Sequence, residues 1–329
     1  MNLICFDLEG PLAPQDNAYE LMKLFYDGGK VFEVISRYDD LLTLQSRPDY
    51  EPGDTLALIV PFLVYHGIKE EQIAAMGQKA GLTPGAAELM TTLKSLGWQI
   101  FCISTSYEQY AIPVTQRLGI PKENVACTSF PLVQIRELLG RNDSVLLEQA
   151  EQEIVKLKPF ADDGKIEDYL DDFYGQRLPQ TGSGRLISQV KPVGGRRKVE
   201  TLEDFSTRTG KPLTDWTVVG DSITDSRMLR AVNKAGGLAI AFNANEYALK
   251  YASMGLASIR LDDLWIVLEA WKKGDRQSVE RMVKEKEMAG GVGDREWFHW
   301  LDGIKDMTAV LEIHRRIRRL VRQEAAELG

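Results

Sequence analysis

Two carboxylates follow the first apolar stretch of the chain. Residues 3–6 are apolar, and Asp7 and Glu9 come directly after them, two residues apart. The apolar run predicts a strand buried on both faces, and the Gly-Pro pair at residues 10–11 turns the chain out of it. In an open parallel α/β sheet, ligands bind at the carboxyl ends of the strands. We therefore expect Asp7 and Glu9 to face a crevice in which they could do chemistry.

A second pair of carboxylates follows another apolar stretch. Asp221 follows a predicted strand over residues 216–219, and Asp225 falls in the first turn of the next predicted helix. Mg²⁺ prefers oxygen ligands and usually keeps several waters, so Asp7, Asp221 and a backbone carbonyl would make a sufficient protein shell. The sequence has no cluster of Cys and His that would indicate zinc. The two strand ends together predict a site for a hard divalent cation.

A serine and a lysine extend this set of polar residues. Ser104 ends a predicted strand over residues 98–103, and the backbone N–H groups after it open a predicted helix, residues 108–118, which could bind an anion. Phosphate fits this position better than a carboxylate, because the site also offers a cation and Lys198 as a point charge. Lys191 is the alternative for this role, but apolar residues at helical spacing follow Lys198.

The order of the predicted elements indicates how these residues are positioned. Apolar strands alternate with amphipathic helices in a βαβ pattern, which predicts an α/β fold with a Rossmann-like parallel sheet. Two mostly helical insertions interrupt it, and a helical C-terminal extension follows it. The predicted boundaries are residues 1–15, 83–129 and 191–262 for the core, 16–82 for a helical cap, 130–190 for the second insertion and 263–329 for the extension.

The composition excludes several classes of protein. The 329 residues are 44% hydrophobic, enough for a large core. A net charge of -8 argues against a general nucleic-acid binder. Three cysteines, in apolar runs without metal-ligand spacing, favour a reduced, cytoplasmic protein. The longest apolar run, residues 56–65, is too short to cross a bilayer, and the N-terminus has no cationic leader, so we expect no membrane insertion.

The four polar segments resemble the haloacid dehalogenase (HAD) superfamily. Residues 7–10 read DLEG, residues 103–105 read IST, Lys198 follows, and residues 220–225 read GDSITD, which is the order in that superfamily. Glu9 and the stretch after the serine are most similar to the phosphoserine phosphatase-like branch. The resemblance covers the predicted core, roughly half of the chain. The insertions and the extension are not matched.

This resemblance implies a HAD-type phosphatase, a Mg²⁺-dependent phosphomonoesterase that acts on a small phosphorylated metabolite. Asp7 would be the nucleophile and would form an aspartyl-phosphate. Glu9 would protonate the leaving oxygen and then activate the hydrolytic water. Mg²⁺ would reduce the repulsion between the Asp7 carboxylate and the phosphate dianion. The substrate itself stays open, because Pro11 stands where the family usually has Thr.

The resemblance also assigns binding roles. The implied metal ligands are Asp7, Glu9 through its carbonyl group, Asp221 and Asp225, the last of which could also support Lys198 or the waters of the metal. The implied phosphate-binding residues are Ser104, Thr105 and Lys198. Asp16 is a candidate for substrate recognition, because it follows the nucleophile at a spacing similar to that of a cap carboxylate in phosphoserine phosphatases.

Simpler or different interpretations stay open. Ser104 could be a helix cap, Lys198 a surface lysine and Asp225 a partner of the helix dipole. The chain could be a non-catalytic accessory or regulatory subunit that retains the fold and binds a protein partner through its extension. A dehalogenase would also use an Asp nucleophile but has no need of Mg²⁺. A phosphotransferase would begin with the same aspartyl-phosphate and pass the group to an acceptor other than water.

The last predicted helix, residues 310–323, is strongly basic. Its apolar residues recur at helical spacing, so we expect one face to pack on the protein and the arginines to form a solvent-exposed basic face. A protein partner or an anionic surface is the second interpretation of this face. The arginines concerned are Arg315, Arg316, Arg318, Arg319 and Arg322.

Overall fold

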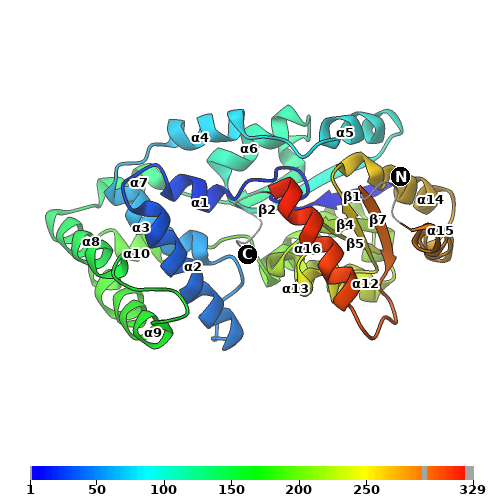
Figure 1. The fold of residues 1–329 in the computed structure, drawn as a ribbon. Helices are drawn as coiled ribbons and strands as arrows, with labels where there is room; N and C mark the ends of the chain where they lie inside the picture. The colour runs from blue at the N-terminus through cyan, green and yellow to red at the C-terminus, as the bar shows by residue number, and fades with distance from the viewer. Residues whose placement is uncertain (1, 291–294, 323–329) are drawn as a thin grey trace.

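One seven-stranded sheet forms the centre of the molecule in the computed structural model, which describes residues 2–290 and 295–322 (Figure 1). The strand order is β3-β2-β1-β4-β5-β6-β7, and every neighbouring pair is parallel except β6 and β7. This confirms the predicted α/β core. The strands are β1 (Leu3–Phe6), β2 (Gln99–Tyr107), β3 (Val125–Thr128), β4 (Trp216–Gly220), β5 (Leu238–Phe242), β6 (Met254–Ser258) and β7 (Glu296–Trp300).

Helices cover both faces of the sheet because its strands are apolar on both sides. In β1, Leu3 and Cys5 belong to one buried cluster and Ile4 and Phe6 to the other. The first cluster includes side chains of α11 (Arg196–Thr209), α12 (Ser226–Ala235), α13 (Glu246–Leu249) and α16 (Thr308–Arg322). The second includes side chains of α5 (Ala86–Ser95), α6 (Glu108–Arg117), α14 (Trp265–Lys273) and α15 (Arg276–Ala289).

The two predicted insertions pack against each other as one helical lobe, at the left in Figure 1. Arg37 forms two hydrogen bonds with the carboxylate of Asp163, at 3.0 and 2.6 Å, and Arg47 pairs with Asp171. The first segment supplies α1 (Asn17–Met22), α2 (Gly28–Leu44) and α3 (Thr55–Tyr65) to this lobe, whereas its α4 (Glu70–Lys79) packs on α6 of the core. The second segment supplies α7 (Leu132–Glu137), α8 (Arg141–Ile154), α9 (Asp163–Asp172) and α10 (Gly184–Ile187). The exact domain boundaries stay a prediction.

Strand β2 is longer than the sequence predicts. It continues through Ser104 to Tyr107, with an irregular register between Ile103 and Tyr107, so Ser104 lies inside the strand rather than at its end. The extra residues stay extended because Tyr107 pairs with Thr128 of β3 and its ring packs in the core. Its hydroxyl group donates to a backbone carbonyl of α3. Helix α6 still begins at the predicted position.

The C-terminal extension contains a strand in addition to its helices. Strand β7 pairs antiparallel with β6 and buries Phe298 and Trp300 against the sheet. The sequence analysis does not predict it, because five residues rich in aromatics carry no clear alternation. The glycine-rich run at residues 290–293 is predicted to be a joint, and residues 291–293 of it lie outside the described residues.

No helix in the described ranges is both long and apolar enough to span a membrane.

Candidate active site

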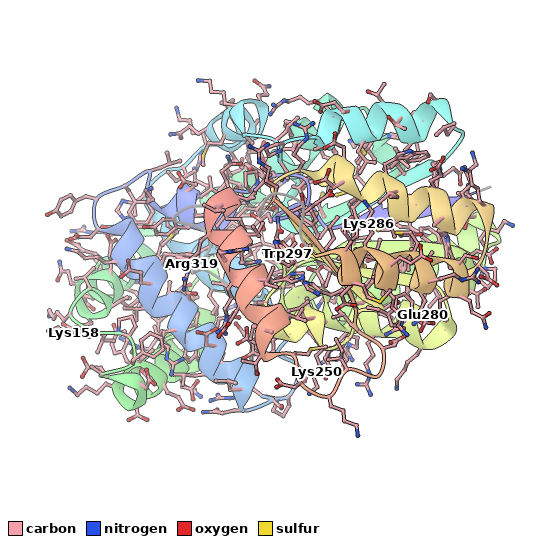
Figure 2. All side chains as sticks on the ribbon, turned by 45° about the vertical axis from the view of Figure 1, so that its right-hand side comes forward. Lys158, Lys250, Glu280, Lys286, Trp297 and Arg319 are labelled. Carbon is pink, nitrogen blue, oxygen red and sulfur yellow. The ribbon has the colours of Figure 1, made fainter. Side chains whose placement is uncertain are left out.

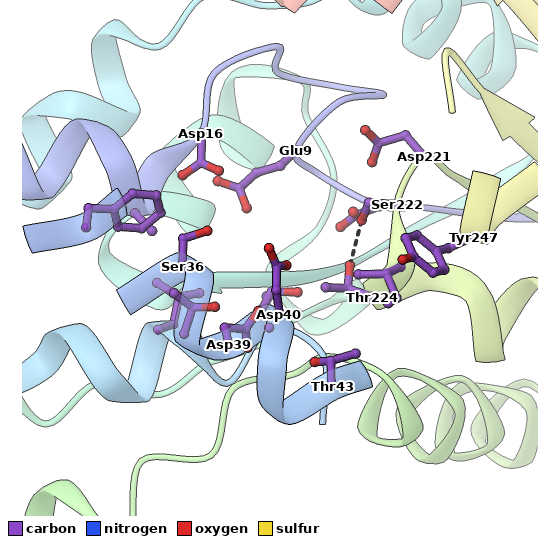
Figure 3. Close-up of a pocket in the computed structure, with 18 of the residues that line it drawn as sticks. Glu9, Asp16, Ser36, Asp39, Asp40, Thr43, Asp221, Ser222, Thr224 and Tyr247 are labelled. Atoms are coloured by element: carbon purple, nitrogen blue, oxygen red, sulfur yellow. Dashed lines mark hydrogen bonds between the residues drawn. The ribbon is translucent and has the colours of Figure 1, made fainter. Parts of the chain in front are cut away.

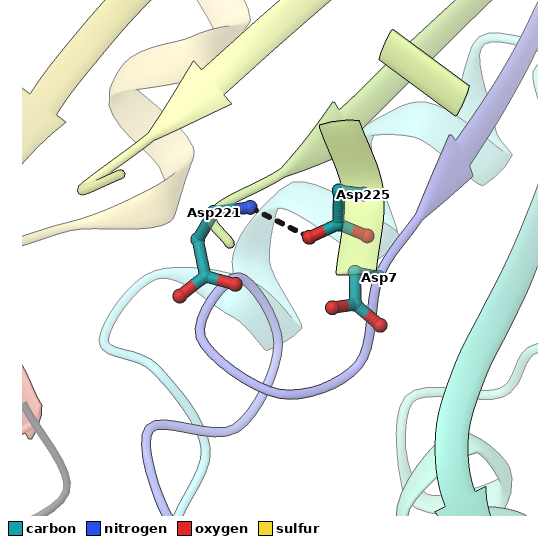
Figure 4. A group of neighbouring side chains, drawn as sticks. All are labelled: Asp7, Asp221 and Asp225. Atoms are coloured by element: carbon teal, nitrogen blue, oxygen red, sulfur yellow. Dashed lines mark hydrogen bonds between the residues drawn. The ribbon is translucent and has the colours of Figure 1, made fainter. Parts of the chain in front are cut away.

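The carboxylates at the ends of β1 and β4 lie close together. The backbone N–H of Asp7 donates to the carbonyl of Val219 at 2.8 Å, which aligns the two strand ends. Asp7, Asp221 and Asp225 each offer one carboxylate oxygen, and these oxygens lie within 4.8 Å of one another (Figure 4). All three side chains are buried. The structure therefore brings together the carboxylates that the sequence analysis selected.

Lys198 lies between two of these carboxylates. Its Nζ atom lies 2.8 Å from Oδ1 of Asp7 and 2.7 Å from Oδ1 of Asp225, and the side chain is fully buried. Burial alone would lower the pKa of Lys198, but the charges of Asp225 and Asp7 outweigh it and raise this pKa. Burial, together with Asp225, raises the pKa of Asp7 well above its ordinary value, although Lys198 opposes the shift. Lys191, the alternative lysine, is exposed.

Asp225 also fixes the loop that carries Asp221. Its Oδ2 atom accepts hydrogen bonds from the backbone N–H groups of Asp221, at 3.0 Å, and of Ser222, at 3.2 Å. Its other oxygen binds Lys198. Asp225 thus has a role in positioning both Asp221 and the lysine, and this is more than a partner for the helix dipole.

Glu9 and Asp16 lie together in the wall of a cavity, next to the beginning of α1 (Figure 3). Glu9 accepts a hydrogen bond from the backbone N–H of Asn17 at 2.7 Å. Asp16 caps α1 by accepting a hydrogen bond from the N–H of Tyr19 at 2.9 Å. Burial, and the nearby charge of Asp16, raise the pKa of Glu9 to about 7. A carboxyl group with this pKa can both give up and take up a proton near neutral pH.

The two residues predicted to bind phosphate lie at different depths. Thr105 lines the cavity next to the carboxylates, and its hydroxyl group donates to the carbonyl of Val193 at 3.3 Å. Ser104 is fully buried, and its Oγ atom accepts from the backbone N–H of Ser106 at 3.0 Å. Thr105 is therefore the one of the two that is open to a ligand in this conformation.

A cavity of about 350 Å³ lies between the carboxylates and the helical lobe (Figure 3). Its wall on the lobe side comes mainly from α2 and mixes polar side chains with the apolar Phe32 and Leu44, so it could bind a polar group attached to the reacting one. The polar residues of α2 in this wall are Ser36, Arg37, Asp39, Asp40 and Thr43. On the opposite side, the loop after β4 contributes Ser222 and Thr224.

Helix α16 brings two arginines into the site that the sequence analysis missed. Arg318 and Arg322 are 3% and 8% exposed, and both donate to Oδ2 of Asp221, Arg322 at 2.8 Å. The expected solvent-exposed basic face is therefore wrong for these two residues. Arg315 and Arg319 of the same helix are exposed. A spacing of four residues from buried His314 to Arg318 and to Arg322 was the available signal, because it places all three on one side of a helix.

The donor set fits a hard divalent cation. Asp7, Asp221 and Asp225 supply oxygen atoms alone, and Mg²⁺ prefers such ligands, whereas zinc sites usually include Cys or His. These three carboxylates are among the metal ligands predicted from the sequence, and Glu9, predicted to bind through its backbone carbonyl, is the fourth. The candidate site can thus hold a cation, an anion and a titrating carboxyl group in one buried pocket.

The chain is similar to solved structures over most of its length. Gene product AF1437 from Archaeoglobus fulgidus is 28% identical, with a TM-score of 0.84 over 100% of this chain and 99% of that one. Phosphoserine phosphatase in its apo form is 17% identical, with a TM-score of 0.51 over 80% of this chain and 98% of that one. The chain has the phosphoserine phosphatase fold. A phospho-aspartyl intermediate analogue of phosphoserine phosphatase gives 18% identity and a TM-score of 0.50, over 80% and 97% of the two chains.

The fold expected from the resemblance, that of phosphoserine phosphatase, is therefore confirmed. The phosphoserine phosphatase fold covers four fifths of the chain, whereas the match to the archaeal protein covers all of it. No family model and no curated protein matches the sequence.

Proposed function

We propose that this protein is a Mg²⁺-dependent phosphomonoesterase that acts on a small phosphorylated metabolite through an aspartyl-phosphate on Asp7. The observation that carries the proposal is the buried cluster of Asp7, Asp221, Asp225 and Lys198, on a fold shared with phosphoserine phosphatases. Phosphoryl transfer requires mainly positioning and charge, and this cluster supplies both.

In the first step, a carboxylate oxygen of Asp7 attacks the phosphorus atom, and the bond from phosphorus to the ester oxygen breaks. Oδ1 of Asp7 accepts from the N–H of Leu8 and binds Lys198, both at 2.8 Å. Oδ2 accepts no hydrogen bond from any described residue, so it is the oxygen that is free to attack. Glu9 gives its proton to the departing oxygen, which leaves as an alcohol. Bound Mg²⁺ would supply positive charge that offsets the repulsion between Asp7 and the phosphate.

In the second step, water attacks the phosphorus atom of the aspartyl-phosphate, and Glu9 takes a proton from that water. The bond between phosphorus and the Asp7 oxygen breaks, which releases inorganic phosphate and restores the carboxylate. A pKa of about 7 suits Glu9 to both roles. Lys198 and Thr105 would bind oxygens of the transferring group, and Asp16 would contact the remainder of the substrate.

The cavity favours a small substrate with a partly hydrophilic leaving group. Its volume of about 350 Å³ suits a small molecule, and the α2 wall offers hydroxyl and carboxylate groups beside the apolar side chains of Phe32 and Leu44. A non-catalytic subunit that only retained the fold would have no need for the complete buried cluster. The catalytic proposal therefore explains more of the observed residues.

The first test is hydrolysis of p-nitrophenyl phosphate and of a panel of phosphorylated metabolites, with Mg²⁺ or with EDTA. We expect turnover that requires Mg²⁺, and Asp7→Asn should reduce kcat by roughly 10³-fold or more, because the amide is a poor nucleophile. Asp204→Asn is the matched control, since Asp204 is an exposed residue on the helix that carries Lys198. Its activity should equal that of the unmodified protein.

Two results would contradict the proposal. One is undiminished activity in Asp7→Asn, and the other is a folded, metal-replete protein that hydrolyses no phosphoester of the panel. Comparison of inorganic phosphate with p-nitrophenol, in the presence of an added alcohol, separates hydrolysis from transfer to another acceptor.

A further inference from the structure

Two guanidinium groups share one oxygen of a candidate metal ligand. Arg318 and Arg322 lie one helical turn apart on α16, and both bind Oδ2 of Asp221. No hydrogen bond from a described residue reaches the other oxygen, Oδ1. In Figure 4 one oxygen of Asp221 points toward Asp7 and the other points away from it. The carboxylate thus has one oxygen bound by the helix and one that is open.

Backbone carbonyls hold both guanidinium groups in place. Nη1 of Arg318 also lies 3.3 Å from the carbonyl oxygen of Asn243, and Nε of Arg322 lies 3.0 Å from that of Pro14. The helix itself is docked on the sheet, because Nδ1 of buried His314 accepts from a backbone N–H that follows β5, at 3.0 Å. These contacts order the arginines, so their binding to Asp221 requires little further loss of conformational entropy.

The arginines compensate the negative charge of the buried Asp221 carboxylate. Lys198 binds Asp7 and Asp225 but makes no contact with Asp221 among the described residues. A buried carboxylate without a partner is strongly destabilising. Arg318 and Arg322 supply that partner for Asp221, and a divalent cation bound to the same carboxylate would supply it as well. The guanidinium groups and the cation therefore neutralise the same charge.

We infer that Arg318 and Arg322 are resident counter-cations of Asp221 and that they weaken the binding of the divalent cation to this site. Positive charges a few ångströms from a bound cation repel it, and burial strengthens this repulsion because there is little solvent to screen it. Binding of the arginines to Asp221 therefore lowers the affinity of the site for the cation, and bound cation weakens the interaction of the arginines with Asp221. This is a negative coupling between two partners of one residue. The inference rests on the metal site of the proposed function, and it does not depend on turnover.

The test measures Mg²⁺ binding to the full chain by isothermal titration calorimetry. Arg322→Gln should bind Mg²⁺ at least about tenfold more tightly than the unmodified protein, a change of about 1.4 kcal/mol. Arg322→Lys keeps the positive charge and should restore the weaker binding. Arg319→Gln is the matched control, because it removes the same charge from the exposed side of the same helix (Figure 2). Solvent and salt screen that charge, so the affinity should change by less than about twofold.

Thermal unfolding provides a second readout. Without metal, Arg322→Gln should unfold at a lower temperature than the unmodified protein, because Asp221 loses a counter-charge. Added Mg²⁺ should then raise the unfolding temperature more in the variant than in the unmodified protein. Arg318→Gln should behave in the same way and serves as the second variant.

Equal or weaker Mg²⁺ binding by Arg322→Gln would overturn the inference, since the arginines would then only position Asp221. Tighter binding that Arg319→Gln reproduces would also overturn it, because a general charge effect would be sufficient. If Arg322→Gln binds Mg²⁺ more tightly but neither protein hydrolyses any phosphoester, the inference stands and the proposed function fails. Phosphatase activity with unchanged Mg²⁺ affinity in the variant gives the reverse conclusion.

Discussion

Gly10 lets the loop after β1 pass directly against Asp221. Its φ angle is +91°, a region that residues with a side chain rarely adopt. A Cβ atom at this position would collide with the carboxyl group of Asp221. The glycine is therefore required for two separate reasons, the backbone angle and the space that Asp221 occupies.

Gly10→Ala should displace Asp221 and reduce Mg²⁺-dependent phosphatase activity by roughly 100-fold, because small misplacements in an active site have large effects. Gly236→Ala is a matched control: Gly236 has a φ of +97°, but a Cβ atom there would meet nothing within 4 Å. Both variants should lose about 1 kcal/mol of stability through the backbone angle. Steady-state kinetics and thermal unfolding check this prediction, and equal activity in the two variants would contradict it.

The sequence was sufficient to predict which residues meet in the site when those residues follow the ends of neighbouring strands. Asp7 and Asp221 follow apolar strands that are neighbours in the sheet, so the sequence was enough to bring them together. The sequence could not show that Arg318 and Arg322 approach Asp221 from α16. That contact depends on how a distant helix docks, which no local pattern encodes.

Helix α2 carries a half-buried carboxyl group away from the cluster of Asp7, Asp221 and Asp225. Asp39 accepts a hydrogen bond from the hydroxyl group of Tyr50, and it lines the cavity. Burial raises the pKa of Asp39 to about 7, although hydrogen bonds from Tyr50 and Thr55 oppose the shift. The folded protein therefore holds a proton on Asp39 that the unfolded chain releases near pH 4.

This difference predicts how stability depends on pH. Because the folded state binds more protons, the contribution of Asp39 to stability should decrease as the pH rises from about 4 to about 7, and then stay constant. Asp39→Asn removes the ionisation and keeps an acceptor for Tyr50. Its unfolding temperature should exceed that of the unmodified protein by a few degrees at pH 8 and be nearly equal at pH 4. Asp204→Asn is again the control, and a gap that does not change with pH would contradict the prediction.

At the scale of elements, the sequence predicted regular strands well and irregular ones poorly. The strands predicted at residues 3–6 and 216–219 correspond to β1 and β4, because continuous apolar runs between turns identify buried strands. Ser104, Thr105 and Ser106 near the end of β2 are polar, and the pairing of Tyr107 with β3 and the packing of its ring in the core keep this segment extended. Strand β7 depends in the same way on the available edge of β6. Local sequence patterns cannot predict such pairing between distant segments of the chain.

Across the whole molecule, ion pairs join the two insertions. Nη1 of Arg47 lies 2.9 Å from Oδ1 of Asp171, between chain segments that β2 and β3 separate. Burial alone would raise the pKa of Asp171, but hydrogen bonds from Arg47 and Tyr38 lower it. The pair should therefore contribute stability above about pH 4, and this contribution is lost as the pH falls further.

A double-mutant cycle of Arg47→Gln and Asp171→Asn measures this contact. The side chains are 36% and 37% exposed, so we expect a coupling energy of only about 0.5 kcal/mol at pH 7. It should decrease in high salt and at pH 3. Urea unfolding of the four proteins provides the values. A coupling energy of zero at pH 7 and low salt would mean that this pair does not link the insertions in solution.

The approach of α16 to Asp221 also affects how the protein is made. Arg322 leaves the ribosome 315 residues after Asp7. Until then, the acidic loops of a nascent chain face each other without the cations that accompany Asp221 in the finished fold. Cellular Mg²⁺ is available during this interval, and an early-folding core could use it as a temporary substitute for the arginines.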